Sequence, residues 1–287
     1  MKLIGIDLGG TKIRGVLINS NGNVIKEKEI FAENNFKKDL EKLVSIIKEF
    51  DYKDIDGIGV GVPGLLDNKR EKVVNFPNLS GWENFNLKKY LEKEFKKKVR
   101  LENDANCVAL AEKKFGNGKN YSNFIVLTLG TGVGGGIIIN DKLYIGKGNA
   151  GEIGYIKVGG MEKCFYNQIG CFESLANGSA IIRMTKESKI NVRDPIELAK
   201  LAKQGNNKAI NVFNKFGENL GKGIVNLIFT LDPEIILIGG GISKNGKLIL
   251  SPAREYIEKN INYKVNLKIV KFVKYGGAIG AACLFLN

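Results

Sequence analysis

The residues best suited to chemistry in this sequence are carboxylates and hydroxyls, because the chain contains no histidine. Histidine is the usual general base near neutral pH and a common zinc ligand. Asp104 stands in the segment LENDAN, where an apolar strand is expected to pass into a helix. Its position favours a helix N-cap, and the alternative is a base that accepts an alcohol proton. Phosphoryl transfer tolerates such a weak base, since positioning and charge neutralisation carry most of the catalysis.

Two glycine-rich turns, each following an apolar strand, are candidates for holding phosphate groups. The first contains Gly9, Gly10, Thr11 and Lys12, and the second contains Gly130, Thr131 and Gly132. Backbone N–H groups in such turns can cradle phosphate oxygens, although each turn alone is equally typical of a tight hairpin. We predict that the two turns, on facing domains, grip a polyphosphate from both sides.

Asp7 ends the strand that precedes the first turn. A carboxylate there can face phosphates only if a metal ion or its waters lie between them, and Mg²⁺ is the expected ion. The alternative is an aspartate that caps its own turn.

Other phosphate-binding motifs are excluded. The sequence has no GxxxxGK[ST] loop. Residues 130–135 match the GxGxxG dinucleotide pattern, but that pattern requires a helix next, and the following Gly-Ile-Ile-Ile run indicates a strand. We therefore exclude NAD.

An internal repeat organises the chain. Residues 3–19 and 124–140 align without gaps, each as a strand, a glycine turn, a second strand and a polar turn. Alternating helices and strands follow each copy, with helices expected over 37–50, 104–115, 173–187 and 207–231. This pattern predicts two α/β domains. The first is a small N-terminal domain over 1–115, completed by a helix over 276–287, and the second is a larger domain over 116–275.

The charge balance gives no evidence for a nucleic-acid or membrane partner. Lys and Arg number 44 against 30 Asp and Glu, a net charge of +14, but the lysines are spread along the chain as on a solvated surface. The uncharged stretch 122–140 is rich in glycine, which favours two strands over a membrane helix. Four scattered cysteines do not make a secreted disulfide scaffold. We expect a cytoplasmic protein.

Eight motifs, in one order from residue 5 to residue 243, resemble the ROK family of bacterial and archaeal sugar kinases and repressors. They are GIDLGGTKIRG, GVGVPG, PNLSGW, LENDAN, LGTGVGGG, GNAGEIG, GCFE and LDPEIILIGGGIS. The resemblance implies a two-domain actin-like ATPase fold (ribonuclease H-like) with a hinged cleft. It also implies ATP-dependent phosphorylation of the 6-hydroxyl of a hexose, with glucose as the default acceptor, and suggests a homodimer.

The same resemblance assigns roles to individual residues. Asp104 would be the catalytic base, and the glycine turns would hold the ATP phosphates. The sugar would be bound by Gly64, Asn78, Asn103, Asp104, Glu152 and Glu173. Charged acceptors at fixed angles discriminate hydroxyl stereochemistry, although both glutamates could equally be exposed and Glu173 could cap a helix. The backbone at Gly239, Gly240 and Gly241 would let the adenosine approach.

The family's zinc motif is degenerate here. Its histidine is replaced by Tyr155, which could still donate one hydrogen bond to a sugar, and its middle cysteine is replaced by Tyr166. Cys164 and Cys171 remain, whereas a structural zinc site needs four nitrogen or sulfur ligands. We predict no zinc, and expect ordinary packed thiols.

Three other functions compete with a glucose kinase. A kinase for mannose or an N-acetylhexosamine would use the same chemistry. A non-catalytic sugar sensor is a second alternative, but the first strand begins by Leu3 and leaves no room for an N-terminal helix-turn-helix. An actin-like filament or chaperone ATPase shares the phosphate turns but does not explain Asn103 and Asp104 together with the two glutamates.

Overall fold

The computed structural model describes residues 1–75, 81–164 and 167–286. The chain divides into two compact units. The first unit comprises Met1–Ser122, Gly136–Gly151 and Lys274–Asn287, and the second comprises Asn123–Gly135 and Glu152–Val273. The domain boundaries expected from the sequence stay a prediction.

The first unit is built on a five-stranded sheet with the order β3-β2-β1-β4-β7. Strands β1 (Lys2–Leu8), β2 (Lys12–Asn19) and β3 (Val24–Phe31) form an antiparallel meander, whereas β4 (Gly57–Val62) and β7 (Val99–Asn103) continue the sheet in parallel with β1. A short hairpin of β5 (Leu65–Leu66) and β6 (Val73–Asn75) follows β4. The parallel strands therefore end on the same edge, where β4 leads to Gly64 and β7 leads to Asp104.

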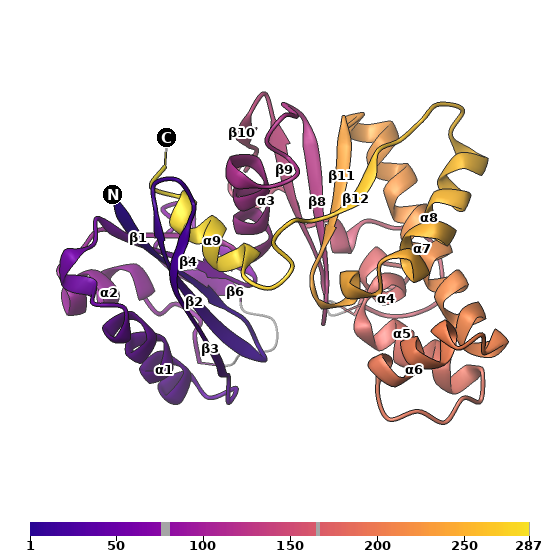
Figure 1. Ribbon diagram of the computed structural model, residues 1–287, viewed down its shortest axis with the longest axis horizontal. Coiled ribbons are helices and arrows are strands. Elements are labelled where there is room, and N and C mark those ends of the chain that lie inside the picture. The colour runs from indigo at the N-terminus through magenta and orange to yellow at the C-terminus, as the bar shows by residue number, and fades with distance from the viewer. Residues whose placement is uncertain (76–80, 165–166, 287) are drawn as a thin grey trace. The chain divides into compact units, whose positions relative to one another are not determined.

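Helices cover the first sheet (Figure 1). Helices α1 (Phe36–Glu49) and α2 (Leu87–Phe95) are amphipathic, and their apolar residues join the core of the sheet. The last helix, α9 (Gly276–Cys283), is wholly buried and packs on β1 and β4. Its close approach depends on glycine, because a Cβ atom at Gly5 or Gly59 would overlap the backbone of α9. Helix α3 (Asp104–Phe115) packs against α9.

The second sheet repeats the order of the first. Its strands are arranged β10-β9-β8-β11-β12, so that a meander is again extended by two parallel strands. The strands are β8 (Phe124–Leu129), β9 (Val133–Ile139), β10 (Lys142–Leu143), β11 (Ile235–Gly239) and β12 (Leu267–Ile269). The internal repeat predicted from the sequence is confirmed. The uncharged stretch 122–140 forms β8 and β9, and within the described residues no helix is long and apolar enough to cross a membrane.

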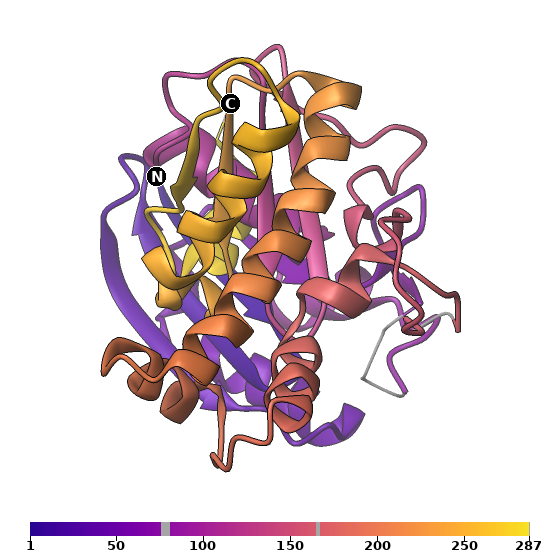
Figure 2. The ribbon, with the colours of Figure 1, turned by 90° about the vertical axis from the view of Figure 1, so that its right-hand side faces the viewer.

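The helices of the second unit are α4 (Phe172–Ala176), α5 (Gly178–Glu187), α6 (Pro195–Lys203), α7 (Asn207–Leu231) and α8 (Lys247–Asn260). Helices α7 and α8 run side by side (Figure 2), and Gly217 and Gly221 of α7 make room for Pro252 and Tyr256 of α8. The single helix expected over 173–187 is wrong. The chain breaks at Asn177, whose extended backbone ends α4 and whose side chain caps α5 by accepting from Ala180 N.

Candidate functional site

The start of α3 presents Asp104 on a firmly held backbone. Asn103, not Asp104, is the N-cap, because its Oδ1 accepts hydrogen bonds from Ala105 N (2.9 Å) and Asn106 N (3.2 Å). The interpretation of Asp104 as the N-cap is therefore wrong by one residue. Asp104 is the first residue of the helix, and its Oδ1 lies 2.9 Å from Ala105 N. The partial positive charge at a helix N-terminus favours a carboxylate at this position.

Gly64 and Asn103 are brought together. The Nδ2 of Asn103 donates to the carbonyl oxygen of Gly64 at 3.3 Å. Gly64 has a φ of 83°, a conformation that glycine adopts without strain, and this turns the chain after β4 so that its carbonyl meets Asn103. An amide nitrogen carries two hydrogens, so Asn103 keeps one more donor for a ligand. Asn78 lies outside the described residues.

A buried carboxylate behind Asn103 was not anticipated from the sequence. Glu102 is 5% exposed, and its Oε1 accepts from Asn103 N at 2.8 Å and from Asn106 Nδ2 at 3.0 Å. The same oxygen lies 3.3 Å from NH1 of Arg70, whose NH2 donates to the carbonyl of Gly148. The signal for this in the sequence is a glutamate between the apolar Leu101 and the polar Asn103, two positions along the strand from the exposed Arg100. Glu102 fixes the junction that carries Asp104.

The first glycine turn is closed by a hydrogen bond from Gly9 N to Lys12 O at 3.0 Å. A Cβ atom at Gly10 would meet no other atom within 4 Å, so this part of the turn is open, and Thr11 is exposed. The ammonium group of Lys12 is paired with Glu29 Oε1 at 2.7 Å, and Arg14 Nε lies 2.7 Å from the other oxygen of Glu29. These two cations lower the pKa of Glu29 to about 2.

Asp7 is half-buried beside this turn. One carboxylate oxygen lies 3.5 Å from NH1 of Arg14, and a Cβ atom at Gly277 would lie 2.8 Å from its Cγ. Burial raises the pKa of Asp7, and the nearby Arg14 opposes that rise. One partly accessible carboxylate, balanced by an arginine, is a donor set that suits a hydrated Mg²⁺ shared with phosphate oxygens.

The second glycine turn is held by Glu173. Gly130 N donates to Gly132 O at 3.0 Å, and Glu173 Oε2 accepts from Val133 N at 3.1 Å. A Cβ atom at Gly132 would lie 2.5 Å from the same Glu173 oxygen, so a larger residue there would displace this carboxylate. Gly178 N, at the start of α5, donates to Gly130 O at 2.8 Å. The turn is thus fixed on both sides by the segment that carries Glu173.

Glu152 lies near Glu173. Burial raises the pKa of Glu152, and the negative charge of Glu173 raises it further. Glu152 precedes a short 3-10 turn, Ile153–Tyr155, in which Tyr155 is half-buried. Two carboxylates close enough to interact form a cluster of acceptors suited to hydroxyl groups.

The turn 239–241 adjoins the second glycine turn. Gly240 has a φ of 79°, and a Cβ atom there would overlap the backbone of Leu129, which directly precedes Gly130. At Gly241 a Cβ atom would meet nothing within 4 Å. The second unit therefore collects the turns 130–132 and 239–241 with Glu152, Tyr155 and Glu173, whereas the first unit collects Asp7, the turn 9–12, Gly64, Asn103 and Asp104.

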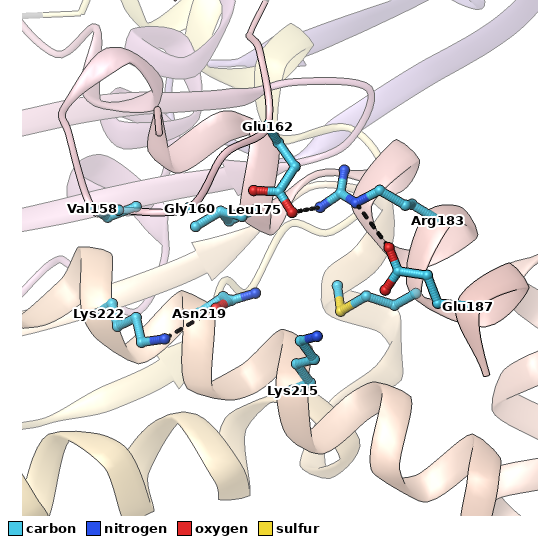
Figure 3. A pocket seen from close by; sticks show the side chains of 11 residues that line it. Val158, Gly160, Glu162, Leu175, Arg183, Glu187, Lys215, Asn219 and Lys222 are labelled. Atoms are coloured by element: carbon cyan, nitrogen blue, oxygen red, sulfur yellow. Dashed lines mark hydrogen bonds and ion pairs between the residues drawn. The ribbon is translucent and has the colours of Figure 1, made fainter. Parts of the chain in front are cut away.

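A separate hollow of about 160 Å³ lies in the second unit between α5, α7 and the loop before α4 (Figure 3). Its charged side chains pair largely with one another. Arg183 lies 3.3 Å from Glu162 and 3.8 Å from Glu187, and Lys222 Nζ lies 3.5 Å from Asn219 Oδ1. None of the predicted site residues is among those described as lining this hollow.

The described residues do not fit the family's zinc ion. The Sγ atoms of Cys164 and Cys171 are 2.8 Å apart. Two thiolates bound to one tetrahedral zinc, with bonds of about 2.3 Å, would be separated by roughly 3.8 Å. Tyr166 lies outside the described residues. Within them, no group of three or more Cys, Asp or Glu side chains is arranged to hold a metal ion.

Two sheets with the same strand order, each carrying a glycine turn after its first strand, define the actin-like ATPase fold with two domains. The ROK family model matches residues 3–287, and the chain belongs to the ROK family. A ROK family glucokinase from Streptomyces griseus, solved in complex with glucose and AMPPNP, superposes with a TM-score of 0.90 at 29% identity, covering 99% of each chain. The ROK hexokinase of Thermus thermophilus superposes with a TM-score of 0.82 at 29% identity, covering 99% of this chain and 97% of that one.

Curated relatives include kinases and repressors. The chain is 32% identical to the glucokinase of Thermotoga maritima, over 99% of this chain and 97% of that enzyme. It is 33% identical to the xylose repressor of Bacillus subtilis, over 90% of this chain but only 69% of the repressor. The match thus extends over almost all of the glucokinase and leaves about a third of the repressor uncovered.

Proposed function

We propose that the protein is an ATP-dependent sugar kinase that phosphorylates the 6-hydroxyl of a hexose, with glucose as its main acceptor. The observation that carries the proposal is the junction at Asn103 and Asp104. There Asn103 supplies the cap, Glu102 fixes its backbone, and Asp104 is left as the first helical residue with its carboxylate at the helix N-terminus. The likeness to glucokinases over nearly the whole chain supports the same assignment.

In the proposed reaction, Asp104 orients the sugar hydroxyl and accepts its proton as the oxygen attacks the γ-phosphate of ATP. The oxygen–phosphorus bond to ADP breaks, and the sugar phosphate is formed. Asn103 donates one amide hydrogen to the carbonyl oxygen of Gly64 and retains the other for a neighbouring sugar hydroxyl. A general base typically contributes about 10²–10⁴-fold to the rate. This is sufficient because the positioning of the two substrates supplies the remaining rate enhancement.

The glycine turns would hold the nucleotide. Phosphates and adenosine can approach the backbone where it is open. These positions are Gly10 and Thr11 in the first unit and Gly130 and Gly241 in the second. To reach a phosphate, the ammonium group of Lys12 has to leave its ion pair with Glu29. When bound, Mg²⁺ neutralises phosphate charge, and Asp7 is the residue that would hold it through water.

Glu152 and Glu173 would accept hydrogen bonds from the other sugar hydroxyls, with Tyr155 as a further donor. A buried acceptor left unpaired costs about 1–3 kcal/mol, which would discriminate between epimers. Kinases for mannose or N-acetylhexosamines are the alternatives within this chemistry. We further propose a cytoplasmic homodimer that has no nucleic-acid partner.

A sugar sensor without kinase activity is the second candidate, because xylose repressors are among the relatives. A coupled assay of ADP release over glucose, mannose and N-acetylhexosamines separates the two. We expect glucose-dependent ADP release, and loss of about 10²–10⁴-fold in turnover for Asp104→Asn. The exposed Asp51→Asn is the matched control, since asparagine tolerates its left-handed backbone. Sugar binding without ADP release would support the sensor.

A further inference from the structure

Cys164 and Cys171 lie at a distance that suits neither a zinc site nor ordinary packing of two thiols. Their sulfur atoms are 2.8 Å apart, only about 0.8 Å more than the length of a disulfide bond. A small rotation of one side chain would bring them to bonding distance.

The backbone between the two cysteines holds them in this position. Cys164 N donates to Gln168 O at 2.9 Å, and Asn167 N donates to Cys164 O at 2.8 Å, so that the chain turns back on itself. Bridges pair Lys163 with Ile169 and Lys157 with Cys171 in antiparallel fashion. The two thiols therefore meet where the described residues on either side of this loop are held together.

We propose that Cys164 and Cys171 are an oxidation site, at which a peroxide converts the two thiols into an intramolecular disulfide. The sulfur of Cys164 attacks a peroxide oxygen, the O–O bond breaks, and a sulfenic acid and one water are formed. The sulfur of Cys171 then attacks that of Cys164 and displaces the hydroxyl, which leaves as a second water. Two thiols and one hydrogen peroxide thus give one disulfide and two waters.

The surroundings assign the order of the two steps. Cys164 is partly exposed and meets the oxidant, whereas Cys171 is fully buried. Burial raises the pKa of the Cys171 thiol, and the ammonium group of Lys157, 3.5 Å from its sulfur, opposes that rise. Cys171 is therefore the resolving thiol, because the oxidant reaches Cys164 first and Lys157 can stabilise the Cys171 thiolate that then attacks it.

The other two cysteines provide an internal contrast. Cys107 is fully buried, and burial raises its pKa well above the ordinary value. Burial likewise raises the pKa of Cys283 to about 12. Thiols that stay protonated and covered react slowly with peroxide, so we expect the first oxidation at the partly exposed Cys164.

The disulfide would close a short loop directly before α4. Cys171 precedes Phe172, the first residue of this helix, and Glu173 follows in its first turn. Closing a loop of about eight residues removes entropy from the unfolded chain, and we expect the Tm to rise by roughly 5 °C.

The test treats the purified full-length protein with a stoichiometric amount of hydrogen peroxide. Cleavage after Lys163 and Arg183 releases one tryptic peptide that holds both cysteines. We expect its mass to fall by two hydrogen atoms, two of the four thiols to be lost on titration, and the Tm to rise, all reversed by dithiothreitol. Cys164→Ser and Cys171→Ser should each abolish the reversible shift, and Cys283→Ala should retain it.

Four unchanged thiols, sulfinic acid on Cys164, or disulfides between molecules would overturn the proposal. Stoichiometric zinc in the untreated protein, protecting both thiols from peroxide, would overturn it as well. The peptide mass is measured on the unmodified sequence, so the outcome stands even if a serine variant fails to fold.

Discussion

The carboxylate of Glu102 lies 3.3 Å from the guanidinium of Arg70, and the same oxygen holds the backbone N–H of Asn103. This relationship links the β5–β6 hairpin to the residue that directly precedes Asp104. Both members of the pair are mostly buried, with side chains 7% and 17% exposed. Removing one charge from such a pair leaves the other uncompensated.

Glu102→Gln keeps the shape of the side chain and removes its charge. We expect the free energy of unfolding to fall by about 1–3 kcal/mol, because Arg70 loses its counter-ion. Chemical denaturation measures this loss. Turnover should also fall, since the backbone of Asn103 is less firmly held. Glu94→Gln is the matched control, because Glu94 pairs with Lys48 on the surface and such pairs are worth at most about 1 kcal/mol. Equal losses for the two variants would contradict this role of Glu102.

Glu29 makes the free energy of unfolding depend on pH in the acid range. Its pKa is lowered from 4.5 to about 2 by Lys12 and Arg14. A lowered pKa means that the folded protein binds this proton less readily than the unfolded chain, so the stabilisation is present above pH 4.5 and is lost as the pH falls towards about 2. With solvent screening we expect about 1 kcal/mol. The difference in unfolding free energy between the wild type and Glu29→Gln should shrink over this range, and a constant difference would contradict the prediction.

Glu152 predicts a pH-dependent affinity for the sugar. Because burial and Glu173 raise its pKa, Glu152 takes up a proton at a higher pH than an exposed glutamate, and its ability to accept two hydrogen bonds falls. We expect the KM for glucose to rise as the pH is lowered, and this rise to begin at a higher pH than the ordinary pKa of a glutamate would give. In Glu173→Gln the negative charge is absent, so the rise should begin at a lower pH. Steady-state kinetics at several pH values measure both. An unshifted profile in Glu173→Gln would show that the two carboxylates do not interact.

Gly240 and Gly241 are neighbours with opposite expected effects. Alanine at Gly240 would overlap Leu129 and would adopt a positive φ, so we expect Gly240→Ala to destabilise the fold by about 2 kcal/mol or more. The methyl group added by Gly241→Ala would meet no atom within 4 Å, so the Tm should stay nearly unchanged. The KM for ATP should rise, because the methyl group would occupy space that the nucleotide is proposed to approach. Thermal melting and ATP titration measure the pair. A normal KM for ATP in Gly241→Ala would place the nucleotide elsewhere.

The sequence alone predicted the two sheets well, because strand–turn–strand repeats are local patterns. It was less successful where a side chain's partner is distant in the sequence. The phosphate role of Lys12 stays a prediction, but its ion pair with Glu29 on the neighbouring strand could not be foreseen from the sequence. Glu102 was overlooked because its partner, Arg70, lies in a hairpin whose position only the fold sets. The cap at Asn103 differs from the expected one by a single residue, a distinction that depends on backbone angles and not on residue type.

The glycines of β1 and β4 have a consequence for synthesis of the protein. Strands β1 and β4 present glycines to a helix, Gly276–Cys283, that follows every other described element along the chain. Until that helix leaves the ribosome, this face of the first sheet stays uncovered, whereas every strand of the second sheet has already emerged. The first sheet is thus made early and covered late, so that it exposes apolar surface during much of synthesis.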